Sequence, residues 1–114
     1  MNFLLTLTLA AGTFFHTALK SSIPAKGASV HAPARISLTF TEKVILAQSS
    51  ISVLTGDSTL VEKLVVKGTS DPATIEGAVT KHLTPGKYVV RWKTASDDGH
   101  VVRNVFGFTI TAGQ

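Results

Sequence analysis

Two successive segments of the sequence alternate regularly between apolar and polar residues. The apolar positions are large side chains at every second residue, Tyr88, Val90 and Trp92 in the first segment and Phe106, Phe108 and Ile110 in the second. Because successive side chains of a β-strand point to opposite faces of a sheet, this period predicts two strands that each bury one face. A polar connection joins the two segments, so we expect them to form a hairpin.

Similar short strand patterns recur from residue 16 onward, separated by clusters of Gly, Pro, Ser and Asp, and no long helical period interrupts them. The predicted strands span residues 18–22, 35–41, 50–54, 60–66, 74–78, 87–95 and 105–111. Seven short strands in a chain of this length are typical of an all-β, antiparallel β-sandwich with immunoglobulin-like or Greek-key connections. The core of this sandwich is expected to contain the largest aromatic side chains: Phe40, Trp92, Phe106 and Phe108.

Composition narrows the possible functions. A length of 114 residues is enough for one domain with a hydrophobic core of its own. The absence of cysteine excludes disulfides, thiolate zinc sites and thiol catalysis. The formal charge is +4, but the Lys and Arg residues are spread along the chain without a basic run. This distribution favours a solvated surface over a nucleic-acid-binding surface.

The first fifteen residues differ from the rest of the chain. They carry no charge and are rich in Leu, Phe and Ala. A stretch of this length is too short for a membrane span and is typical of a secretory signal. We therefore expect residues 1–15 to be a signal peptide and residues 16–114 to be the mature domain. Cleavage directly before His16 would follow two phenylalanines, whereas the Ala-Ala-Gly run at residues 10–12 fits the small-residue rule better and would leave residues 13–15 ahead of His16.

The connection of the predicted hairpin contains an Asp-x-His sequence. If the chain is extended there, Asp98 and His100 project to the same face, where a carboxylate oxygen and an imidazole nitrogen can converge on one ion. Nitrogen and oxygen donors without sulfur suit Cu(II), Ni(II) or Zn(II). The alternative interpretation is an ordinary turn, in which Asp97, Asp98 and Gly99 supply Asx hydrogen bonding and a positive φ while His100 is simply exposed.

Further residues at characteristic spacings surround this sequence. In the C-terminal half they are Pro85-Gly86, Tyr88, Val90, Trp92, Ser96, Asp98-Gly99-His100, Phe106 and Phe108. Upstream, residues 16–27 begin with His16 and include a Ser-x-Pro-x-x-Gly turn, and residues 32–42 form the next strand pattern. Together these motifs cover about half of the chain and resemble the CopC family of periplasmic copper-resistance proteins.

This resemblance implies an exported protein that binds one Cu(II) ion and buffers or delivers copper, in the periplasm or outside the cell, beside a membrane copper transporter. The family holds copper through the α-amine and imidazole Nδ1 of an N-terminal His and through an Asp-x-His segment. The matching positions here are His16, Asp98 and His100. Should processing leave residues ahead of His16, the site loses the α-amine of His16 and Zn(II) becomes a more credible metal ion for it. The methionine-rich Cu(I) site of many members is absent, because the only methionine is Met1.

Two other functions stay open at this point. One is a copper oxidase or oxygenase, because a His bound through its amine and imidazole is also the active centre of oxygenases that attack polysaccharides. A coordinating Asp98 would fill the position that oxygen activation needs, so we expect no enzyme. The other is a metal-free immunoglobulin-like structural or adhesion module. The two remaining histidines, His31 and His82, are expected to be surface residues.

Overall fold

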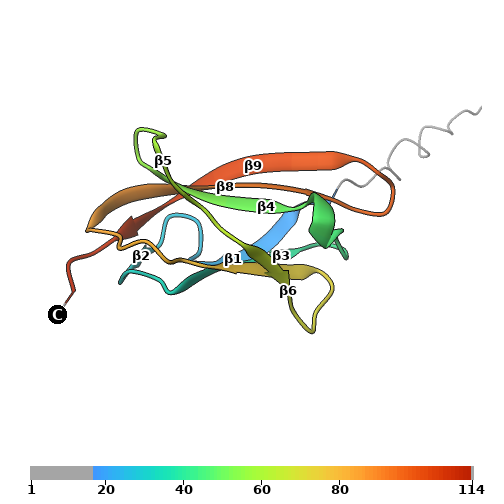
Figure 1. Ribbon diagram of the computed structural model, residues 1–114, viewed down its shortest axis with the longest axis horizontal. Coiled ribbons are helices and arrows are strands. Elements are labelled where there is room, and N and C mark those ends of the chain that lie inside the picture. The colour runs from blue at the N-terminus through green and yellow to red at the C-terminus, as the bar shows by residue number, and fades with distance from the viewer. Residues whose placement is uncertain (1–16, 114) are drawn as a thin grey trace, which may run out of the picture.

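The computed structural model describes residues 17–113, which form two β-sheets packed face to face (Figure 1). The four-stranded sheet has the order β1 (Leu19–Ile23), β3 (Arg35–Phe40), β7 (Thr74–Ala78) and β6 (Val66–Gly68). The five-stranded sheet has the order β2 (Ser29–Val30), β9 (Val101–Ile110), β8 (Gly86–Ala95), β4 (Ser50–Thr55) and β5 (Leu60–Lys63). A single turn of 3₁₀ helix, η1 (Leu46–Gln48), precedes β4. Within the described part, no helix is of the length and hydrophobicity that crossing a membrane requires.

The predicted all-β sandwich is confirmed, with three differences in its strands. The expected strand 60–66 is divided into β5 and β6, which belong to opposite sheets. Leu64 lies between them, buried in the core, and its backbone N–H still donates to the carbonyl oxygen of Ile51 on β4, so the chain leaves the five-stranded sheet only after this residue. Strand β2 is additional to the seven predicted strands, because two residues are too few to show a period. It pairs in parallel with β9, so the predicted antiparallel arrangement is wrong for this one pair.

The third difference is that β9 begins at Val101 and not at residue 105. Residues 101–104 pair in register with the last four residues of β8, from Ala95 back to Trp92. Both faces of this part of β9 are largely accessible to solvent, so its sequence lacks the apolar–polar alternation by which strands are predicted. The hairpin is consequently longer than expected and extends its turn beyond the core.

The core lies between the two sheets and contains the four aromatic side chains expected from the sequence. The rings of Phe40 on β3 and Trp92 on β8 meet edge to face, with their centroids 5.1 Å apart. Because β3 and β8 belong to different sheets, this contact joins the two layers near one end of the sandwich. Pairs of this kind add stability beyond the area that they bury.

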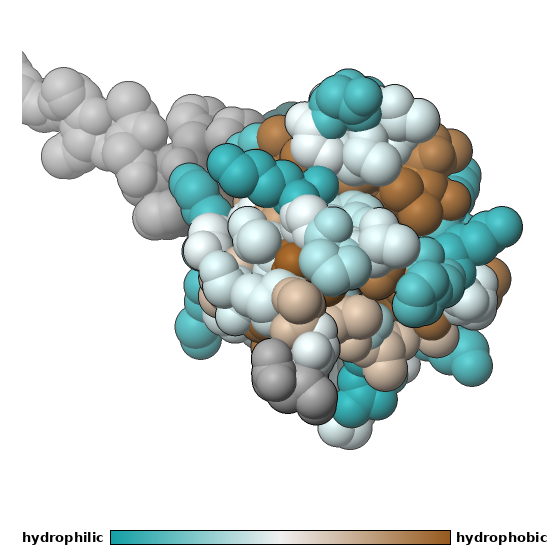
Figure 2. Space-filling view, turned by 90° about the vertical axis from the view of Figure 1, so that its left-hand side faces the viewer, coloured by the Kyte–Doolittle hydropathy of each residue, from teal (hydrophilic) through white to brown (hydrophobic). Residues whose placement is uncertain are grey.

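The same end of the sandwich holds the start of the described chain and the turn of the β8–β9 hairpin (Figure 1). Leu19 at the beginning of β1 pairs with Phe40, and Phe40 contacts Trp92 near the end of β8. The last described residues lie at the opposite end, where hydrophilic side chains surround limited hydrophobic areas (Figure 2). The start of the described chain and the β8–β9 hairpin, which are far apart in the sequence, are therefore neighbours at this end.

Candidate metal centre

The connection between β8 and β9 is a tight turn. The N–H of Gly99 donates to the carbonyl oxygen of Ser96 over 3.0 Å, and Gly99 has a φ of +82°. A positive φ of this size suits glycine, which has no Cβ to clash with the backbone. The segment is thus not extended, and its backbone agrees with the turn interpretation of Asp97-Asp98-Gly99.

The turn nevertheless brings the side chains of Asp98 and His100 together. Oδ2 of Asp98 lies 3.4 Å from Nδ1 of His100. Oδ1 of Asp98 accepts two hydrogen bonds, one of 2.9 Å from the N–H of His100 and one of 2.8 Å from Oγ of Ser96. The first of these is the Asx hydrogen bond that two-residue spacing allows. The carboxylate is therefore held by one oxygen while its other oxygen faces the imidazole.

This separation fits binding of a common metal ion. Two donor atoms that each lie about 2.0–2.2 Å from one transition metal are about 2.8–3.1 Å apart at a right angle and about 3.3–3.6 Å apart at a tetrahedral angle. The Oδ2–Nδ1 distance of 3.4 Å falls in the tetrahedral range, and a tetragonal site would need the two atoms to approach by a few tenths of an ångström. Both side chains are also accessible, with exposed fractions of 45% for Asp98 and 63% for His100. An ion can therefore reach the pair from solvent without rearrangement of the turn.

Two neighbouring residues support this arrangement, and the sequence analysis had assigned neither of them a role in it. Ser96 is only 2% exposed and fixes the carboxylate of Asp98 from the base of the hairpin. Its position two residues before Asp98 is a signal that could have been used. Lys43 forms an ion pair of 3.2 Å with Asp97. The carboxylate of Asp97 is therefore bound to Lys43 and not to the Asp98–His100 pair. Nothing in the local sequence indicates this contact, because Lys43 lies far from the turn along the chain.

The third predicted ligand, His16, lies outside the described residues. Thr17, which follows it, is buried and lines a cavity of about 340 Å³ together with Trp92 and Asn104. Within residues 17–113, Oγ1 of Thr17 and Nε1 of Trp92 are buried atoms without a hydrogen-bond partner. The chain after His16 is thus packed against the base of the β8–β9 hairpin.

The other histidines do not contribute to this pair. His31 and His82 are both exposed, as the sequence analysis expected. In the described part of the chain, no three or more His, Cys, Asp or Glu side chains lie close enough together to hold a metal ion. Asp98 and His100 are therefore the pair of candidate ligands that the described residues supply.

Comparison with known proteins gives consistent matches over this fold. A family model of the CopC domain matches residues 19–111. The chain is 33% identical over 101 residues to copper resistance protein C of Pseudomonas syringae pv. tomato, a match that covers 83% of this chain and 80% of that protein. It is 30% identical over 107 residues to copper resistance protein C of Xanthomonas campestris pv. juglandis, a match that covers 89% of this chain and 84% of that protein. The crystal structure of CopC from Methylosinus trichosporium OB3b is similar with a TM-score of 0.79 and 32% identity, over 87% of this chain and 97% of that one.

Proposed function

The chain belongs to the CopC family, and on this premise we propose that its mature form binds one Cu(II) ion through His16, Asp98 and His100. The observation that supports this proposal most directly is the 3.4 Å separation of Asp98 Oδ2 and His100 Nδ1 on an accessible turn. The curated relatives that it resembles are copper resistance proteins. A carboxylate and an imidazole are donors that Cu(II) accepts well.

The proposal includes removal of residues 1–15, so that His16 becomes the N-terminal residue of a domain spanning residues 16–114. Its α-amine and Nδ1 would then complete a tetragonal set of nitrogen and oxygen donors, the geometry that Cu(II) prefers. The position of β1 supports this, because Leu19 pairs with Phe40 at the end of the sandwich where the Asp98 turn lies. The chain has no cysteine, and its only methionine is Met1, so a sulfur site for Cu(I) is not available to the mature chain.

In this role copper is cargo. The exposure of Asp98 and His100 suits exchange of the ion with a partner, and the proposed partner is a membrane copper transporter. Secretion through the proposed signal peptide would place the protein in the periplasm or outside the cell. We propose carriage and not catalysis, because a coordinating Asp98 occupies a position that oxygen would need at the metal.

The test is the intact mass of the exported protein under native conditions, measured with and without one equivalent of Cu(II). We expect a chain that begins at His16 and retains one copper ion. Asp98→Ala and His100→Ala should lose that ion, whereas His31→Ala and His82→Ala remove exposed histidines outside the pair and should keep it. A chain that holds no copper, or one whose copper is unaffected by His100→Ala, would contradict the proposal.

A further inference from the structure

The five-stranded sheet has a cationic outer face. Five exposed side chains occupy outward positions on three of its strands: Lys63 on β5, Lys87, Arg91 and Lys93 on β8, and Arg103 on β9. The register agrees with this placement, because Lys93 pairs directly with Arg103, and Lys63 and Arg91 both pair with Ser52. Like charges opposite each other on neighbouring strands destabilise a sheet, so fold stability alone does not account for this arrangement.

Acidic side chains do not balance this face. Within residues 17–113, the ion pairs of Lys and Arg are Arg35–Glu76 and Lys43–Asp97, and neither involves the five cations. Glu62 lies on β5, but its carboxylate accepts hydrogen bonds from the backbone N–H groups that follow β7. The four-stranded sheet differs, because Glu76 lies among its cations in register with Lys67. Positive charge is thus concentrated on one side of the sandwich.

Aliphatic side chains lie among these cations. Leu54 is 3% exposed and yet does not belong to the core cluster, which places it on the outer face of the sheet. Its register partner Leu60 is 54% exposed, and Val105, opposite Arg91, is also 54% exposed. Cationic side chains around exposed aliphatic ones are the composition of surfaces that bind at a membrane interface.

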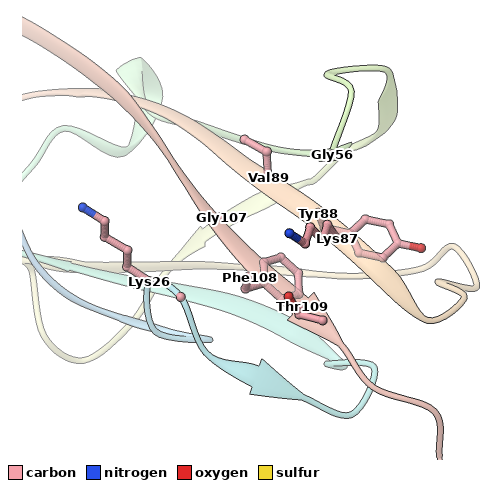
Figure 3. Close-up of a pocket in the computed structure, with 9 residues that line it drawn as sticks. Lys26, Gly56, Lys87, Tyr88, Val89, Gly107, Phe108 and Thr109 are labelled. Atoms are coloured by element: carbon pink, nitrogen blue, oxygen red, sulfur yellow. The ribbon is translucent and has the colours of Figure 1, made fainter.

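A hollow in the same face lies next to Gly107. It has a volume of about 380 Å³, and Lys26 and Lys87 line it together with Gly107 and Thr109. Lys87 reaches this hollow from β8, whereas Lys26 lies on the other side of β9 and its ammonium group points away from Gly107 (Figure 3). The loop that carries Lys26 is joined to β9 by a hydrogen bond of 2.7 Å from the N–H of Gly27 to the carbonyl oxygen of Gly107. The ammonium group of Lys87 beside this hollow suits a phosphate group.

We propose that this face binds a lipid bilayer that contains anionic phospholipids. Residues on one face of a strand are about 7 Å apart, within a screening length of about 8 Å at physiological salt, so the fields of neighbouring cations add. The exposed aliphatic side chains favour a bilayer over an acidic polypeptide, because they can enter its interface. In the described part of this face the strands turn their aromatic residues inward, which leaves no ring on which nucleic-acid bases could stack. This proposal does not depend on the copper site.

The test uses the copper-free mature protein and sucrose-loaded vesicles, made either of phosphatidylcholine alone or of phosphatidylcholine with phosphatidylglycerol. We expect sedimentation with the phosphatidylglycerol vesicles at low salt and release at high salt. Each basic residue near such a surface contributes a factor of about five in partitioning. The Arg91→Gln/Lys93→Gln double variant should therefore partition about 25-fold less.

The matched control is Lys20→Gln/Lys67→Gln, which removes the same charge from exposed positions of the four-stranded sheet. It should change partitioning less than about twofold. Equal losses in the two double variants would assign binding to total charge and overturn the proposal. Absence of binding to the phosphatidylglycerol vesicles would also overturn it, and retention on immobilised poly-glutamate in that case would assign the face to an acidic polypeptide.

Discussion

The buried hydroxyl of Ser96 donates a hydrogen bond of 2.8 Å to Oδ1 of the accessible carboxylate of Asp98. Ser96 follows directly after β8, so its position is set by the sheet. The carboxylate therefore has a fixed anchor, although it lies on a turn at the end of a long hairpin. Partners of this kind orient metal ligands and reduce the entropy that binding would otherwise cost.

Replacement of Ser96 by Ala is expected to weaken Cu(II) binding about 10-fold to 100-fold while one ion is still bound. The measurement is a competition titration against a Cu(II) chelator of known affinity. Ser52→Ala is a suitable control, because Ser52 is also buried but lies on β4. If both variants bind copper as tightly as the parent protein, Ser96 does not orient the ligand.

Acetylation of the α-amine of His16 should weaken Cu(II) binding more than Ser96→Ala does. It converts the amine into an amide without adding a new amine, so the chelate of amine and imidazole is lost and three side-chain donors remain. The preference for Cu(II) over Zn(II) should fall as well. The same titration, with electron paramagnetic resonance to count nitrogen ligands, measures both effects. The protein with a free N-terminus serves as control, and an unchanged spectrum after acetylation would exclude the amine as ligand.

Gly77→Ala is expected to destabilise the fold by about 1–3 kcal/mol, which is the usual cost of overpacking. A Cβ at Gly77 would lie 2.7 Å from Cβ of Leu64, where β7 faces the core. Gly107→Ala on the open face of β9 is the matched control, because its Cβ would meet only the carbonyl oxygen of Tyr88, at 3.6 Å. Urea denaturation compares the two. Similar stabilities of the two variants would show that Leu64 can move away at little cost.

Glu62 should make the stability of the fold dependent on pH in the acid range. Its pKa is lowered from the ordinary value of 4.5, first because the hydroxyl of Thr80 donates a hydrogen bond to its carboxylate. A carboxyl group with a lowered pKa stabilises the folded state fully above its ordinary pKa, and this contribution is lost as the pH falls through the lowered value. This contact also joins β5 to the segment after β7, in the opposite sheet.

Glu62→Gln should therefore be less stable than the parent protein near neutral pH, and the difference should shrink as the pH falls below 4.5. Thermal unfolding at a series of pH values measures the difference. Glu42→Gln is the control, because Glu42 is exposed and follows β3 outside any strand. A difference that stays constant with pH would mean that the charge of Glu62 does not contribute.

Most of the sandwich could be predicted from the sequence, because the alternation of side chains across a strand is a local property. Phe106 and Phe108, for example, indicate a buried strand face without any knowledge of the partner strand. The prediction of one strand over residues 60–66 is wrong, because the chain passes there from one sheet to the other. The start of β9 at Val101 was also missed, because exposed residues show no such alternation.

The candidate site also combines features that are local in the sequence with contacts that only the fold creates. The two-residue spacing of Asp98 and His100 is local, and so is the turn-forming role of Gly99, so the sequence was sufficient to predict that the two side chains lie together. Their role as metal ligands stays a prediction. Only the tertiary structure brings Lys43 to Asp97 and the start of β1 to the hairpin end. These contacts depend on strand pairing between distant parts of the chain.

The distribution of charge shows most clearly that the sequence does not reveal which distant residues share a surface. Along the sequence, the cations are spread without a basic run, which suggested a simply solvated surface. Pairing of β5, β4, β8 and β9 places Lys63, Arg91 and Arg103 on one face with their neighbours. The sequence by itself determined the strand period, the core aromatics and the Asp-x-His turn, since each depends on residues close together in the chain. The tertiary structure alone decided which scattered residues share a surface, because sheet register joins residues that the sequence separates.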